Sequence, residues 1–157
     1  MQALNYSPLA SLQGKSSFLY LLPFNTQPQA NDRIYFPMNS ALDNSRIVGI
    51  ETHVHYGGFD FDLPATINLN GTTFNVITAL EITNMVLTLV NKQRRQVLDR
   101  YPFQALQNQF AAPFLTQKTK VFRKFDLSIL SGESYVTFTD IAVVAAPFVA
   151  PITFYYE

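Results

Sequence analysis

Short apolar runs and alternating segments, separated by turn residues, dominate the pattern along this chain. In residues 84–101, the apolar run 85–90 is interrupted only by Thr88. A run of this kind is typical of a strand that is covered on both faces. The polar segment 92–95 predicts a turn, and the following residues predict a returning strand that stops at Pro102, because proline has no N–H to donate. The pattern therefore predicts a central β-hairpin.

Further strands are predicted on both sides of this hairpin. Residues 17–22 and 33–36 each precede a proline, and a second hairpin is predicted around Asn70-Gly71, a pair that favours the two positive φ angles of a type I′ turn. The segments expected to be strands in the rest of the chain are 46–56, 65–69, 72–78, 121–129, 134–144 and 152–156. Residues 103–110 carry apolar side chains at helical spacing and predict one or two helical turns. About ten short strands with little helix indicate an all-β sandwich or barrel.

The chain is expected to form one domain with an extended N-terminal arm. Residues 1–16 show no period and contain Pro8 and Gly14, so they predict neither a helix nor a regular strand. Four apolar side chains in this arm are expected to anchor it, namely Leu4, Tyr6, Leu9 and Leu12. The β-sandwich domain is predicted over residues 17–157. The first residues lack a basic start followed by an apolar core, so no signal peptide is expected.

Composition indicates that part of the surface is covered by another molecule. Hydrophobic residues make up 48% of the 157 residues and charged residues only 14%, against about 25% charged in ordinary soluble domains. Eleven basic residues balance eleven acidic ones, so electrostatic attraction to nucleic acid or to an anionic membrane is not expected. The chain has no cysteine, which excludes disulfides and thiolate metal sites.

The alternation in residues 46–56 gives the most specific candidate site. The face expected to enter the core carries Val48, Ile50, Thr52, Val54 and Tyr56, and the face expected to point outward carries Ile47, Gly49, Glu51, His53 and His55. His-x-His is a common spacing of metal ligands, and Asp60 or Asp62 is the nearest carboxylate that would complete a site. However, one strand does not make a closed coordination sphere. We therefore predict an outward polar face without a bound metal or cofactor.

Other chemistry has little support in the sequence. The chain contains no Gly-x-Ser-x-Gly elbow, no phosphate-binding loop and no Gly-x-Gly-x-x-Gly turn, so we do not expect an enzyme. Two mildly basic clusters comprise Lys92, Arg94, Arg95 and Arg100, and later Lys118, Lys120, Arg123 and Lys124. Together they would be able to touch phosphate, but the balanced charge favours an ordinary charged turn and strand ends.

The order of segments in residues 84–157 resembles a known family. The central hairpin ends in Asp-Arg-Tyr-Pro-Phe-Gln-Ala-Leu and is followed by Arg-Lys-Phe-Asp-Leu-Ser-Ile, by Ser-Tyr-Val-Thr-Phe-Thr-Asp and by a terminal Ile-Thr-Phe-Tyr-Tyr. This pattern is similar to the later strands of jelly-roll capsid proteins of small icosahedral viruses, including tailless phages. The resemblance implies a single jelly-roll-like antiparallel β-sandwich of about 8–10 strands. It also implies a structural protein of the virion, a subunit of the icosahedral shell or of its vertices.

The expected partners follow from this resemblance. They are copies of the same chain and other virion proteins, and the contact candidates are Leu4, Tyr6, Leu9, Leu12, Glu51, His53 and His55. Many RNA-virus capsid proteins begin with a basic arm, whereas residues 1–16 here carry only Lys15. Direct contact with nucleic acid is therefore not expected, and contact with a membrane stays open. Two alternatives remain, a carbohydrate-binding or adhesin-like β-sandwich and a cupin-like metalloenzyme that uses His53 and His55.

Overall fold

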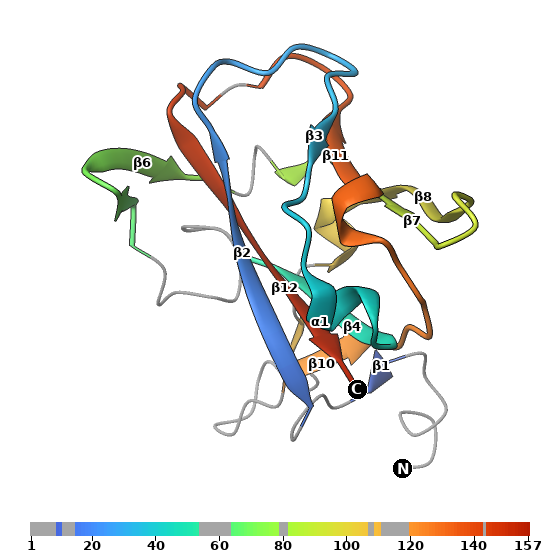
Figure 1. Ribbon diagram of the computed structural model, residues 1–157. Helices are drawn as coiled ribbons and strands as arrows, with labels where there is room; N and C mark the ends of the chain where they lie inside the picture. The colour runs from blue at the N-terminus through green and yellow to red at the C-terminus, as the bar shows by residue number, and fades with distance from the viewer. Residues whose placement is uncertain are drawn as a thin grey trace.

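The computed structural model of the chain is an all-β protein with twelve strands, one short α-helix and two 3₁₀ turns among the residues that it describes (Figure 1). Those residues are 9–10, 15–53, 64–78, 82–106, 109–110, 120–142 and 144–157. The strands are β1 (Leu9–Ala10), β2 (Ser16–Phe24), β3 (Ile34–Tyr35), β4 (Ile47–Thr52), β5 (Thr66–Leu69), β6 (Thr72–Val76), β7 (Met85–Val90), β8 (Gln96–Pro102), β9 (Gln109–Phe110), β10 (Lys120–Arg123), β11 (Tyr135–Phe138) and β12 (Phe148–Tyr156). The helical segments are α1 (Ser40–Asp43), η2 (Phe103–Leu106) and η3 (Ser131–Glu133).

Two sheets face each other across the core, and their strands pair antiparallel except for the parallel pairing of β12 with β6. One is four-stranded, with the order β3-β11-β7-β8. The other is built on the long pair β2 and β12, and β12 also pairs with β4 at one end and with β6 at the other. Residues just after β10 continue this sheet beyond β4, because the N–H of Leu127 and the carbonyl of Ile47 are 3.1 Å apart and the reciprocal bond is 2.7 Å. Figure 1 shows β7 and β8 on one side of the β2–β12 pair and β6 on the other.

The strand order is that of a jelly roll. Without β1 and β9, which flank β10 in a separate three-stranded sheet, and without the β5–β6 hairpin, eight segments remain in chain order. They pair as first with eighth (β2–β12), second with seventh (β3–β11), third with sixth (β4 with the continuation of β10) and fourth with fifth (β7–β8). One sheet therefore has the order first, eighth, third, sixth, and the other has the order second, seventh, fourth, fifth. Such nesting describes one long hairpin rolled into two sheets, so the expected jelly-roll-like sandwich is confirmed.

The core is rich in aromatic side chains that meet between the sheets. Phe24 stacks on Phe148 with ring centroids 4.5 Å apart, and Phe138 meets Phe24 in an edge-to-face contact with ring centroids 5.6 Å apart. From the four-stranded sheet, alternate residues of β7 enter this core at Met85, Leu87 and Leu89. The remaining residues of β7 are also buried, which confirms the prediction of a strand covered on both faces.

The two predicted hairpins are present. β7 and β8 flank a turn at residues 91–95, and β8 ends at Pro102 as expected. β5 and β6 are joined by Asn70 and Gly71, whose φ angles are +51° and +86°. Both angles are positive, as a type I′ turn requires.

Two strands run through prolines that were expected to end them. β2 contains Pro23, and β12 contains Pro151. β2 is an edge strand whose sheet neighbour is β12, so a missing N–H is tolerated there. The carbonyl of Pro151 accepts from the N–H of His53, so the nitrogen of Pro151 faces the same side, between the pairing with β6 and the pairing with β4. Proline thus falls at the junction of two partner strands, where no ladder bond is required.

Other boundaries also differ from the prediction. β11 ends at Phe138 rather than near residue 144. Within residues 103–110, the first four form the 3₁₀ turn η2, but Gln109 and Phe110 form a short strand. The side chains of Phe103 and Leu106 are buried in the core, so their helical spacing was informative.

Candidate functional site

Glu51 does not point into solvent as the alternation predicted. Only 3% of it is exposed. The register of β4 against β12 shifts between Tyr155 and Tyr156, and this irregularity brings Ile47 as well as Ile50 into the main core. Val48 instead packs against Tyr155 outside that core. The assignment of Ile47 and Val48 to their faces was therefore wrong, because a bulge reverses the alternation.

Glu51 and His53 belong to a polar cluster between β4 and β12. The hydroxyl of Tyr155 donates to Oε1 of Glu51 at 2.9 Å, and Nε2 of His53 lies 2.8 Å from Oγ1 of Thr153. The same Nε2 is 3.8 Å from Oε1 of Glu51. In a hydrolytic triad the acid and the nucleophile contact opposite ring nitrogens. Here these two contacts fall on the same ring nitrogen, Nε2, and not on opposite nitrogens.

The metal hypothesis gains no support from the side chains that are described. No three His, Asp or Glu residues come close enough to hold an ion within that part of the chain. His55, Asp60 and Asp62 lie outside the described residues. The prediction that the protein binds no metal therefore stays a prediction.

The arm residues are only partly placed. Leu4, Tyr6 and Leu12 lie outside the described residues. Leu9 and Ala10 form β1, which pairs with β10 of the same chain, Leu9 opposite Arg123. This pairing attaches the backbone of residues 9–10 to its own domain, and contact of the other anchors with a neighbouring subunit stays a prediction.

A pocket that the sequence did not indicate lies on the outer face of the four-stranded sheet. Its volume is about 250 Å³, and we call it the outer pocket. It is lined by Asn31, Arg33, Thr88, Gln96, Asp99, Arg100, Tyr135 and Thr137. Thr88 lies opposite Tyr135 in the pairing of β7 with β11, so neighbouring strands supply the floor of the pocket.

A β-bulge shapes one wall of the outer pocket. Between the pairs Leu89–Leu98 and Leu87–Tyr101, β7 has one residue, Thr88, whereas β8 has two, Asp99 and Arg100. The N–H of Arg100 donates to Oγ1 of Thr88 at 3.2 Å, and the φ angle of Arg100 is +47°. A left-handed arginine is uncommon, and such residues concentrate at binding and catalytic sites.

Arg33 forms the opposite wall of the outer pocket. Its guanidinium lies 4.6 Å from the ring centroid of Tyr135, within range of a cation–π contact. Hydrogen bonding with the side chain of Tyr35 and the proximity of Tyr135 raise the pKa of Arg33 above its ordinary value, so this side chain stays cationic. Within the described part of the chain, neither Arg33 nor Arg100 forms an ion pair.

Thr137 contributes a buried polar atom to the same pocket. Only 5% of the residue is exposed, and Oγ1 is buried with no hydrogen-bond partner among the described residues. Threonines 88 and 137 each interrupt an otherwise apolar or aromatic strand. That interruption is a sequence signal that would have pointed to the outer pocket. From the sequence, Thr88 had been noted only as a break in an apolar run and Arg100 only as part of a basic cluster.

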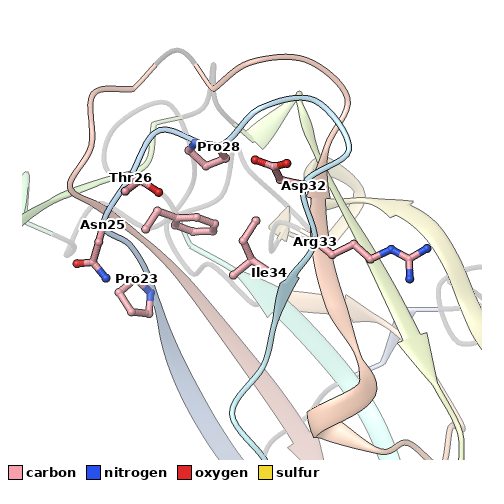
Figure 2. Close-up of a pocket in the computed structure, with 8 residues that line it drawn as sticks. Pro23, Asn25, Thr26, Pro28, Asp32, Arg33 and Ile34 are labelled. Carbon is pink, nitrogen blue, oxygen red and sulfur yellow. The ribbon is translucent and has the colours of Figure 1, made fainter.

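A second pocket, of about 340 Å³, lies at the loop between β2 and β3 (Figure 2). Pro23, Thr26, Pro28 and Ile34 contribute to its lining. Arg33 lines both pockets, and Figure 2 shows its guanidinium extending away from Pro23, Pro28 and Ile34. The carboxylate of Asp32 accepts from the N–H of Gln29 at 2.9 Å, which is a contact internal to the loop.

Comparison with known proteins returns no matching family model, no similar curated protein and no similar solved structure. Among the helices of the described residues, none has the length and apolar character needed to cross a membrane.

Proposed function

We propose that this chain is a structural protein of a virion, a subunit of an icosahedral shell or of its vertices. The observation that carries the proposal is the order of the strands, in which eight segments nest as a single jelly roll. Viral capsid proteins use this fold, although lectins and cupins use it too. Features of the protein surface favour a shell subunit over a lectin or a cupin.

Apolar side chains are exposed where two sheet edges meet. β2 and β3 are edge strands, and the hydroxyl of Tyr20 on β2 donates to the carbonyl of Pro37 after β3 at 2.8 Å, so both edges border one side of the sandwich. The exposed apolar residues along this β2–β3 side are Phe18, Leu19, Tyr35 and Met38. Met38 is 81% exposed and Leu19 is 49% exposed. Exposed apolar groups beside open strand edges are typical of contact surfaces between subunits.

The partner that we propose for the β2–β3 side is a second copy of the chain. The low charge content of 14% applies to the whole molecule, as expected for a subunit that is surrounded by neighbours. Repeated copies related by symmetry would cover the β2–β3 side and leave few apolar groups in water. Other virion proteins would then contact the assembled shell, and the chain would reside in the virion.

Two substitutions to lysine on the β2–β3 side test this proposal. We expect Leu19→Lys combined with Met38→Lys to weaken self-association more than tenfold, because each charge would have to lose water at the contact. The measurement is sedimentation velocity across a concentration series. Gln93→Lys with Thr73→Lys adds the same charge at exposed positions away from this side and should assemble as the unmodified chain does.

A shell subunit is not supported if the two double variants assemble equally well. Retention of the cooperative unfolding transition in both variants ensures that a loss of assembly reflects the contact and not the fold.

A further inference from the structure

The outer pocket combines two features that each cost stability and that the fold does not require. One is the unpartnered hydroxyl of Thr137, and the other is the left-handed backbone of Arg100 at the bulge. A buried hydroxyl without a partner is unfavourable in an empty pocket, whereas the strain at Arg100 is a backbone feature of the kind that concentrates at binding sites. We propose that the outer pocket binds an acidic sugar of about one ring, with Arg33 and Arg100 contacting its carboxylate.

The charges of the lining residues favour an anion. Two arginines stand against one aspartate, Asp99, so the charged lining side chains sum to one positive charge. Neither arginine is neutralised by an ion pair with another described residue. Guanidinium groups bind carboxylates through paired, charge-assisted hydrogen bonds, which makes arginine the preferred cation for this group.

The remaining lining groups favour hydroxyls over a bare anion. The neutral polar side chains are Asn31, Thr88, Gln96 and Thr137. Amides and hydroxyls both donate and accept, and the carboxylate of Asp99 accepts from hydroxyl donors. A hydroxylated ring would use such groups, and one of its hydroxyls would supply the partner that Oγ1 of Thr137 lacks.

The size of the pocket favours a small ligand over a polymer backbone. Pockets for drug-sized ligands occupy about 300–1,000 Å³, and the outer pocket, at about 250 Å³, suits one sugar ring. Nucleic-acid sites instead rely on an extended excess of positive charge. The chain has eleven basic and eleven acidic residues, so a sugar fits the site better than a nucleic-acid phosphate does.

Saturation-transfer NMR on the full chain tests this proposal, since the method works for a free subunit and for a large assembly. The probes are methyl glucuronide, methyl galacturonide and methyl N-acetylneuraminide, each compared with its neutral methyl ester. We expect at least one acid to bind with a Kd of about 1 mM, the order expected for a ligand of this size. Its ester should bind more than tenfold more weakly.

Substitutions of the lining residues test whether the sugar binds in the outer pocket. Arg33→Gln and Arg100→Gln should each weaken binding of that acid more than tenfold, and Thr137→Val should weaken it severalfold. Arg95→Gln is the matched control, because Arg95 is exposed in the turn before β8 and does not line the pocket. It should bind the acid as the unmodified chain does.

The proposal is overturned if all three acids fail to bind at 20-fold excess over the expected Kd, or if acid and ester bind equally. Equal loss of binding in Arg95→Gln, or displacement of the sugar by acetate at the same concentration, would also overturn it. Because the readout does not depend on self-association, a negative result leaves the proposal of a shell subunit in place.

Discussion

At the scale of single residues, two residues of the outer pocket differ from those that would make the sheet most stable. Thr137 pairs opposite Val86 on a buried part of the sheet, where valine would fill the same volume without a polar atom. Arg100 takes a backbone conformation in which glycine or asparagine is far more common. Both residues satisfy the local needs of a binding site better than those of a stable sheet.

Thr137→Val is expected to raise the free energy of unfolding by about 1 kcal/mol, because it removes a buried hydroxyl that has no partner in the empty pocket. Urea unfolding of the two proteins measures the difference. Thr73→Val, at an exposed position of β6, is the control and should change stability by less than about 0.5 kcal/mol. A clear loss of stability in Thr137→Val would show that the hydroxyl already has a partner.

Gly71 is a residue whose role the sequence did predict. Its φ angle is +86°, and no heavy atom lies within 4 Å of the position that a Cβ would occupy. Strain in a Gly71→Val variant would therefore come from the backbone alone, and we expect it to cost about 1–3 kcal/mol. Thermal unfolding of this variant beside Thr72→Val, which keeps an ordinary strand conformation, measures the effect. An unchanged midpoint would contradict the hairpin.

At the scale of elements, the contact between the first two sandwich strands depends on Tyr20. Its hydroxyl reaches the carbonyl of Pro37, and its ring lies 5.0 Å from that of Phe36. Burial is the largest cause that raises the pKa of Tyr20 above 10.0. Because the pKa in the folded state exceeds that in the unfolded state, the protonated group favours the fold below pH 10.0, and this contribution is lost as pH rises through the folded pKa.

Tyr20→Phe should cost about 0.5–1.5 kcal/mol near neutral pH, where one hydrogen bond is lost. The gap between the two proteins should narrow as pH rises above 10.0, since only the unmodified chain has this group to titrate. Urea unfolding at about pH 8 and at about pH 11 measures the gap at both ends of the titration. A gap that stays constant would show that Tyr20 does not couple protonation to folding.

The elements that the sequence predicted best are those with local signals. The Asn70-Gly71 turn and the β7–β8 hairpin depend on neighbouring residues, and both were found as expected. The positions of Glu51 and Pro151 depend on what lies beside them in the sheet. Glu51 is buried beside Tyr155 of β12, which donates to its carboxylate, and Pro151 is accommodated between two partner strands. Neither the contact with Tyr155 nor the junction leaves a trace in the pattern of residues 46–56 or 147–157.

At the scale of the whole molecule, the all-β class could be predicted from the sequence, and the strand order agrees with the jelly-roll-like sandwich that was expected. The outer pocket could not be predicted from the sequence, because its residues come from four separate segments of the chain. Those segments meet only through pairing of β3 with β11, β11 with β7 and β7 with β8. Spacing along the sequence carries no record of such long-range contacts.

A shell subunit and a sugar-binding pocket are compatible in one jelly roll. The apolar β2–β3 side borders the open edges of both sheets, whereas the outer pocket occupies the outward face of the four-stranded sheet. The two surfaces adjoin at Tyr35, whose ring lies 5.4 Å from that of the pocket residue Tyr135, whereas Leu19 and Met38 do not line the pocket. We therefore expect variants at Leu19 and Met38 to alter the mass of the assembly without altering sugar binding.

The mass of the protein in solution tests most directly whether the chain is a subunit of a closed shell. Light scattering coupled to size-exclusion chromatography, with electron microscopy of the leading fraction, gives both the mass and the shape. For a shell subunit we expect a closed assembly with a mass many times that of the 17.8 kDa chain, at least at high concentration. A single species of 17.8 kDa at every concentration up to the solubility limit would contradict it.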